Sequence, residues 1–151
     1  MRHNRWAMVV LWMFVIFLFS HQDASMSLES SDFLSDIVKT LVINIREDQF
    51  IEQWIIEHIR ELAHIGVFMI LGGLLLHALN HHHDSEQYTY TSVIGISYAI
   101  IDEIHQSFIP GRAFQLTDIA LDTLGVGLAI FGLIVMKHFM KKETKNDTTT
   151  T

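Results

Sequence analysis

Apolar residues in this chain are gathered into long runs, and the lengths of these runs limit the folds that the chain can adopt. Residues 62–79, 90–109 and 116–136 each come close to the roughly 20 residues that an α-helix needs to cross a bilayer. Half of the residues are hydrophobic, 18% are charged, and the single proline leaves long helices uninterrupted. We therefore expect an all-α integral membrane bundle.

An earlier apolar run covers residues 6–20 and follows Arg2 and Arg5. This run is short for a span, and its length is close to that of the apolar core of a cleaved signal peptide. The run is rich in bulky aromatic residues, however, and no Ala-x-Ala cleavage site follows it. We expect this helix to be retained as the first of about four spans.

Residues 23–61 are mixed in character, and two amphipathic helices are predicted within them. Their apolar residues recur at helical spacing, with carboxylates on the opposite side. The two apolar sets are Phe33, Leu34, Ile37, Val38, Leu41, Val42 and Ile45, then Phe50, Ile51, Trp54, Ile55 and Ile59. We expect both helices to lie on the outer surface of the membrane.

Basic residues flank the apolar runs and predict the orientation of the chain. These residues are Arg2, Arg5, Lys137, Lys141, Lys142 and Lys145. The positive-inside rule then places both termini in the cytoplasm and residues 23–61 outside. A single transmembrane domain is expected over residues 1–140, followed by a disordered, threonine-rich tail over residues 141–151.

Charge and cysteine content remove some classes of function. The formal net charge of −7 argues against nucleic-acid binding. The absence of cysteine removes disulfides, thiolate metal sites and a cysteine nucleophile. The remaining candidates for chemistry are therefore carboxylates, histidines and arginines.

Polar side chains interrupt the expected spans near their outer ends. They are His64 in the second span, Asp102, Glu103, His105 and Gln106 in the third, Arg112 in the turn, and Asp118 and Asp122 in the fourth. An ionised group at the middle of a bilayer costs about 2.5–3.5 kcal/mol on insertion scales, so such residues are expected only where they have a structural or functional role. Because Pro110 ends the third span, a rise of about 1.5 Å per residue places its polar groups within roughly 5–12 Å of the outer surface. We expect all of these side chains to converge in the outer leaflet.

The polar residues share helix faces with small residues, which favours an inward orientation. At about 100° per residue, one stripe contains Gly95, Ala99, Asp102 and Gln106, and another contains Asp118, Asp122, Gly125 and Gly132. Small residues allow close contact between helices in a membrane. The polar groups on these stripes should therefore point into the bundle.

Two interpretations of this cluster remain open. One is an interhelical ionic network in which Arg112 neutralises one or two carboxylates. The other is a functional site, which is favoured because the cluster holds four carboxylates and one nearby arginine. A divalent metal held by His64, Glu103, His105 and Asp118 is a variant of the second interpretation. The tract from His81 to His83 is interpreted as a polar connector.

Three sequence blocks resemble the VanZ-like family of bacterial membrane proteins. They are Arg60-Glu-Leu-Ala-His64, then Tyr98-Ala-Ile-Ile-Asp102-Glu-Ile-His-Gln106-Ser-Phe-Ile-Pro-Gly-Arg112, then Asp118-Ile-Ala-Leu-Asp122-Thr-Leu-Gly125, with Phe17, Ser20 and Gln22 in the first span. The resemblance implies a multi-pass protein of the bacterial cytoplasmic membrane, whose namesake is associated with low-level teicoplanin resistance. The family pattern often has asparagine at the position of Asp122. The resemblance does not supply a reaction.

Two functions from different classes follow from these residues. The first is an enzyme of the cell envelope that acts on a lipid-linked or cell-wall substrate, with Glu103 or Asp102 as base, His105 as proton shuttle and Arg112 holding an anionic head group. The second is a non-catalytic protein that binds or masks a lipopeptide, a wall precursor or a partner protein. The sequence gives no cofactor, oligomeric state or substrate identity.

Overall fold

A computed structural model of the chain describes residues 2–22, 33, 37, 40 and 49–147. This part of the chain forms four α-helices and contains no strand. The helices are α1 (Arg2–Ser20), α3 (Gln49–Ala78), α4 (Asp84–Gln106) and α5 (Leu116–Asp147). The predicted all-α class is therefore confirmed for the described residues.

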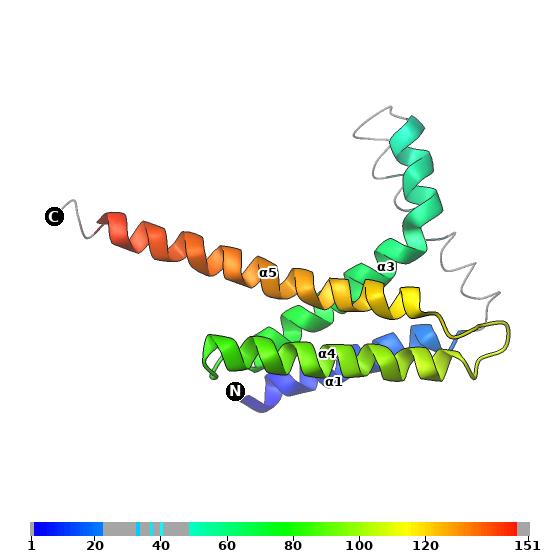
Figure 1. The fold of residues 1–151 in the computed structure, drawn as a ribbon, viewed down its shortest axis with the longest axis horizontal. Helices are drawn as coiled ribbons and strands as arrows, with labels where there is room; N and C mark the ends of the chain where they lie inside the picture. Colours follow the sequence, from blue (N-terminus) through cyan, green and yellow to red (C-terminus); the bar gives the residue numbers. More distant parts are fainter. Residues whose placement is uncertain (1, 23–32, 34–36, 38–39, 41–48, 148–151) are drawn as a thin grey trace.

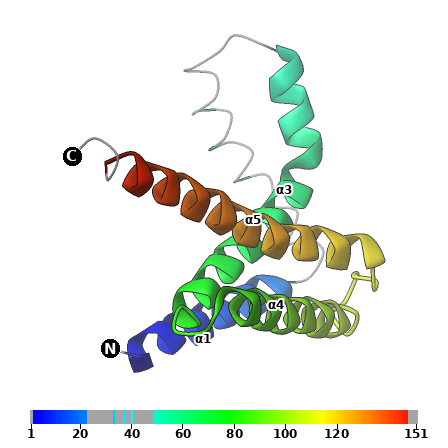
Figure 2. The same cartoon turned by 60° about the vertical axis from the view of Figure 1, so that its left-hand side comes forward.

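The helices run alternately up and down (Figure 1). Helices α1 and α4 point in one direction and α3 and α5 in the other, so each end of the bundle has its own set of connections. We call the end with the turn of residues 107–115 and the last residues of α1 the α4–α5 end. The end with the turn of residues 79–83 is the α3–α4 end. The first part of α3 rises away from the other helices (Figure 2).

Helix α3 is continuous across a boundary at which the sequence predicted two separate helices. The second amphipathic helix and the second span were predicted as separate elements, but Gln49–Ala78 is one helix of 30 residues. No glycine or proline lies between residues 49 and 65, so nothing in the backbone interrupts the helical hydrogen bonds where the apolar pattern changes. The first amphipathic helix falls largely outside the described residues. The tail predicted to be disordered from residue 141 is helical as far as Asp147.

Helix α3 contacts α1, α4 and α5, and its contact with α5 is the most extensive between any two of the described helices. Its inner face is formed by Phe68, Leu71, Leu75 and Ala78, which follow the three-to-four spacing of one helix side and are at most 1% exposed. Their buried neighbours are Val9 and Ile16 from α1, Ala99 from α4 and Val126 from α5.

Glycines set the closest approaches between helices. A Cβ at Gly95 would lie 2.8 Å from a methyl carbon of Val126, and one at Gly125 would lie 2.9 Å from the backbone nitrogen of Met69. Both distances are too short for a real side chain, so the predicted close contacts at Gly95 and Gly125 are confirmed. The prediction was wrong for Gly132, which is exposed and has open space beside it. Most side chains of α5 beyond Val126 are partly or fully exposed.

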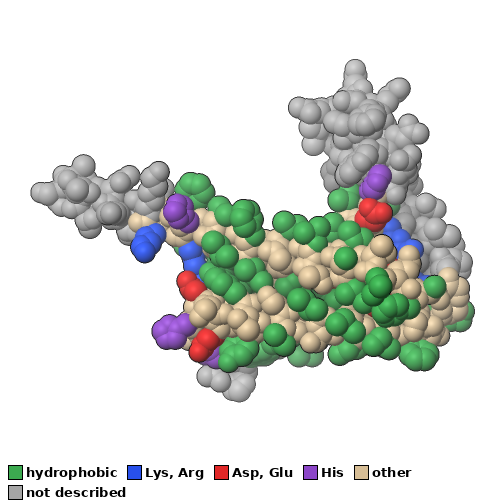
Figure 3. Space-filling view, in the orientation of Figure 1, with side chains coloured by type: hydrophobic (Ala, Val, Ile, Leu, Met, Phe, Trp, Pro, Cys, Tyr) green, Lys and Arg blue, Asp and Glu red, His purple; other side chains and the backbone are tan. Residues whose placement is uncertain are grey.

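The exterior of the bundle is apolar between two polar ends. On the face in Figure 3, charged and histidine side chains gather at the two ends, and hydrophobic side chains cover the middle. Two segments are long and apolar enough to cross a membrane, His58–Ala78 and Leu116–Lys141, and the apolar part of α1, Asn4–Ser20, is shorter. Large exposed side chains such as Leu11 and Phe131 would be costly in water and suit contact with lipid.

Candidate functional site

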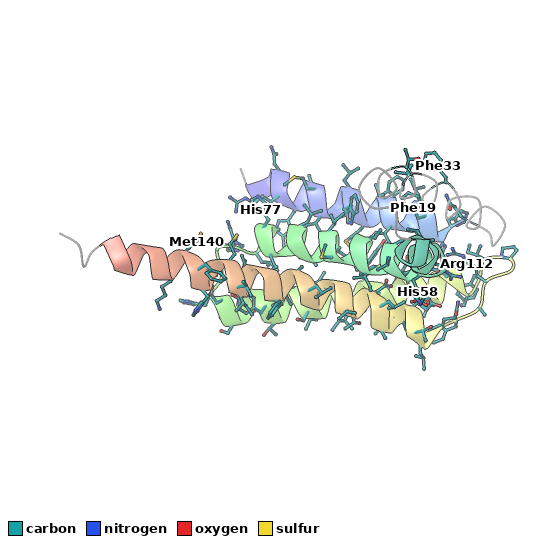
Figure 4. The ribbon with its side chains drawn as sticks, turned by 90° about the horizontal axis from the view of Figure 1, so that it is seen from above. Phe19, Phe33, His58, His77, Arg112 and Met140 are labelled. Carbon is teal, nitrogen blue, oxygen red and sulfur yellow. The ribbon has the colours of Figure 1, made fainter. Side chains whose placement is uncertain are left out.

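Six buried polar side chains lie toward the α4–α5 end of the bundle. They are Ser20, Asp102, Glu103, Gln106, Asp118 and Asp122, each at most 7% exposed. Figure 4 places Arg112 at this end, with Phe19 and His58, and His77 at the opposite end. Helix α4 buries Gly95, Ala99, Asp102 and Gln106 together, as the predicted stripe requires.

The first group of contacts joins α1 to α4. Ser20 Oγ donates to Asp102 Oδ2 at 2.7 Å, and Gln106 Nε2 donates to the same oxygen at 2.9 Å. Gln106 Nε2 also lies 3.3 Å from Ser20 Oγ. Since Asp102 Oδ2 already accepts two hydrogen bonds, this carboxylate is well satisfied. Ser20 was noted only as part of a family pattern, although its position at the polar end of an apolar run was a signal for such a role.

The second group joins α3 to α5. His64 Nδ1 lies 2.9 Å from Asp122 Oδ1, and His64 Nε2 lies 3.8 Å from Asp118 Oδ2. Asp118 also pairs with Arg60, whose Nη2 lies 3.2 Å from Oδ2. Arg60 was not predicted as a site residue, although its spacing of four residues from His64 puts both on one face of α3.

Asp122 fixes the tautomer and the orientation of the His64 ring. An ionised carboxylate only accepts hydrogen bonds, so Nδ1 carries the proton in this pair and Nε2 presents its lone pair. The Asp122 side chain is 1% exposed, and no solvent competes for the bond. A histidine held from behind by a buried carboxylate has a fixed orientation and tautomer, which suits it to proton transfer or ligand binding.

Glu103 holds the turn between α4 and α5. It is 1% exposed, and its Oε1 accepts a hydrogen bond from the backbone nitrogen of Gln115 at 2.6 Å. Its Oε2 is buried and has no hydrogen-bond partner among the described residues. Glu103 therefore fixes the chain just before α5 begins, which places Asp118 and Asp122 relative to α4.

The predicted metal ligands do not come together. His105 Nε2 lies 3.3 Å from His21 Nδ1, and the His105 ring lies 4.7 Å from that of Phe17, so His105 faces the end of α1. His64 and Asp118 lie between α3 and α5 instead. Glu103 and His105 are two positions apart on α4, which turns them about 200° from each other. Among the residues that the structure describes, no three histidine or carboxylate side chains are placed to hold a metal ion.

A cavity of about 370 Å³ adjoins both groups of contacts. Helices α1 and α3 supply its apolar walls, with Phe19, Val67 and Phe68 among them. Its polar lining consists of Ser20, Gln22, Arg60, His64, Asp102, Gln106 and Arg112. Glu103, His105, Asp118 and Asp122 were predicted with the other site residues but do not line the cavity.

Arg112 reaches the cavity from the turn after α4. Gly111 has a φ of 78°, a conformation that favours glycine, and it reverses the chain directly before Arg112. Burial, followed by the nearby Arg60 guanidinium, lowers the pKa of Arg112 from its usual value. An arginine still remains charged at neutral pH, so it offers a partly desolvated cation to an anion.

The comparisons with known proteins agree with the sequence blocks. The VanZ/LLP1 family model matches residues 5–137, which include all four described helices in whole or large part. No curated protein and no solved structure matches the chain. The match covers most of the chain and includes every residue of the two contact groups and of the cavity lining. The chain therefore belongs to the VanZ/LLP1 family.

Proposed function

We propose that this VanZ-like membrane protein acts on a lipid-linked or cell-wall substrate bound in the cavity, with His64 as the group that transfers a proton. The observation that carries this proposal is the double role of His64, which lines the cavity and is held by buried Asp122 at 2.9 Å. A positioned general acid or base contributes typically about 10²–10⁴-fold to a rate. Asp122 acts as a positioning residue, because it lies behind the ring.

The geometry favours His64 over the residues that the sequence suggested as base (Asp102 or Glu103) and as proton shuttle (His105). Asp102 already accepts hydrogen bonds from Ser20 and Gln106, while Glu103 and His105 do not line the cavity. His64 Nε2 is 3.8 Å from the nearest oxygen of Asp118, beyond hydrogen-bond distance, so that nitrogen remains able to exchange a proton with a ligand.

The test replaces His64 by glutamine in a strain that lacks the endogenous gene. His64→Gln removes the titrating ring, and we expect the lipid and wall-precursor profile to match that of the deletion strain, with unchanged protein in the membrane. His138→Gln is the matched control, because His138 is exposed on α5 and does not line the cavity. A normal profile with His64→Gln would exclude the proton-transfer role. Susceptibility to teicoplanin gives a second readout.

A non-catalytic function in binding or masking is the second candidate. The hydroxyl group in the cavity lining belongs to Ser20, which donates a hydrogen bond to Asp102. Ser20 forms its hydrogen bonds with Asp102 and Gln106, and no described histidine is placed to act as a base for this hydroxyl. If the protein only binds or masks its ligand, His64→Gln should leave precursor turnover unchanged. This result would distinguish a binding protein from an enzyme.

We further propose that the protein lies in the bacterial cytoplasmic membrane with four spans and both termini in the cytoplasm. The positions of Lys137 and Lys141 toward the C-terminal end of α5 support this orientation, since basic residues are retained on the cytoplasmic side. A reporter fused after Asp147 is expected to be cytoplasmic, and one fused at Glu47 is expected to be external. An external reporter at Asp147 would reverse the assignment.

A further inference from the structure

We infer that the occupant of the cavity is a lipid with an anionic phosphate head group, which enters from the bilayer between α1 and α3. This inference rests on the proposed function and names the class of its substrate. It depends on the shape of the cavity, on the apolar surface around its opening and on the charges at its polar end.

Two small residues on α3, Ala63 and Gly66, leave room for the hollow. Ala63, Gly66, Val67 and Ile70 all line the cavity, and their spacing places them on one stripe of the helix. A Cβ at Gly66 would meet nothing within 4 Å, so the space beside it is open. Trp12 Nε1 donates to the carbonyl oxygen of Val67 at 3.0 Å and keeps α1 against α3 beside this space.

The cavity opens toward the side of the bundle that suits lipid. Phe19 and Ile70 line it and are nevertheless 54% and 45% exposed, so they form part of its rim. Met8 and Val15 lie on the same side of α1 as Phe19, within about 40° of it around the helix axis, and Met8 is 41% exposed and Val15 is partly exposed. An acyl chain can therefore pass from the bilayer into the cavity along a continuous apolar surface.

Two arginines lie at the polar end of the cavity. Arg60 and Arg112 line it together with one carboxylate, Asp102. Arg60 also pairs with Asp118, which does not line the cavity. Asp102 is occupied by Ser20 and Gln106 and is not available to a cationic head group. Arginine donates in a planar fork that matches phosphate oxygens. Inorganic phosphate alone would leave the apolar walls unfilled, which favours a lipid phosphate.

Filling the hollow tests the binding of the acyl chain. The purified protein is incubated in detergent with phosphatidylglycerol, phosphatidylcholine or inorganic phosphate, and native mass spectrometry measures the bound ligand. Gly66→Leu is expected to weaken retention of phosphatidylglycerol about tenfold, equivalent to about 1.4 kcal/mol. Gly73→Leu is the matched control, because Gly73 is on the same helix, has equally open space and does not line the cavity. Gly66→Ala adds one methyl group and should give a smaller loss.

Removing a cation tests the head group. Arg112→Gln is expected to abolish the preference for phosphatidylglycerol over phosphatidylcholine, whereas Lys137→Gln, which removes a charge bonded to Asp84, should preserve it. Equal retention by Gly66→Leu and the wild type, or binding of inorganic phosphate alone, would refute the inference. If the wild type retains no lipid while His64→Gln still fails in cells, this inference fails and the proton-transfer proposal stands.

Discussion

Replacing Gly125 by alanine is expected to destabilise the folded bundle by about 1–3 kcal/mol, the usual cost of overpacking a tight contact. The added Cβ would lie under 3.0 Å from the carbonyl oxygen of Ile65 and 2.9 Å from the backbone nitrogen of Met69. Both neighbours belong to the backbone of α3, which cannot rotate away as a flexible side chain would. The helices must separate, and thermal unfolding in detergent should show a lower midpoint.

Gly127→Ala provides the control for this change. Gly127 lies on the same helix, is exposed, and a Cβ there would meet nothing within 4 Å. The same methyl group is therefore added without a clash, and we expect wild-type stability. Equal midpoints for Gly125→Ala and Gly127→Ala would mean that α3 and α5 do not cross as closely as the structure indicates.

The Gly125 contact also bears on function. Ile65 is the neighbour of His64 in sequence, and Gly125 follows Asp122 by three residues, so the tight crossing lies one helical turn from the His64–Asp122 pair. Separating α3 from α5 would lengthen a hydrogen bond of 2.9 Å. We therefore expect Gly125→Ala to impair precursor turnover, and Gly127→Ala to leave it unchanged.

Replacing Asp122 by alanine is expected to lower the rate of precursor turnover by about 10²–10⁴-fold, the range of a lost general acid or base. Alanine has no side-chain oxygen, so it cannot accept a hydrogen bond from His64. The ring then loses the contact that fixes its orientation and its tautomer. Turnover is measured in membranes of the deletion strain that carry equal amounts of each variant.

A double replacement separates this role from simple structural damage. If Asp122 acts through His64, adding Asp122→Ala to His64→Gln should cause no further loss, because the two residues act as a unit. Asp84→Ala is the control, since Asp84 is an exposed carboxylate paired with Lys137 at the opposite end of the bundle. Losses that multiply in the double variant, or a fully active Asp122→Ala, would contradict the assignment.

Properties that repeat along one helix could be predicted from the sequence. The lengths of the apolar runs predicted long apolar helices, and two segments, His58–Ala78 and Leu116–Lys141, are long and apolar enough to cross a membrane. The period of the helix predicted that Gly95, Ala99, Asp102 and Gln106 share a buried face, and all four are buried. Depth along the helices likewise predicted that polar groups from several segments meet near the turn before α5.

The pairing of those groups was decided by the tertiary structure. Glu103 and His105 lie at similar depths, so depth alone did not predict that their contacts differ. Glu103 accepts a hydrogen bond from Gln115, whereas His105 packs against His21 and Phe17. Depth also did not predict that His64 pairs with Asp122. These partners depend on the rotation and spacing of neighbouring helices, which the contacts at Gly95 and Gly125 set between segments far apart in the sequence. The cavity exists for the same reason, since its walls come from two helices whose separation no local pattern encodes.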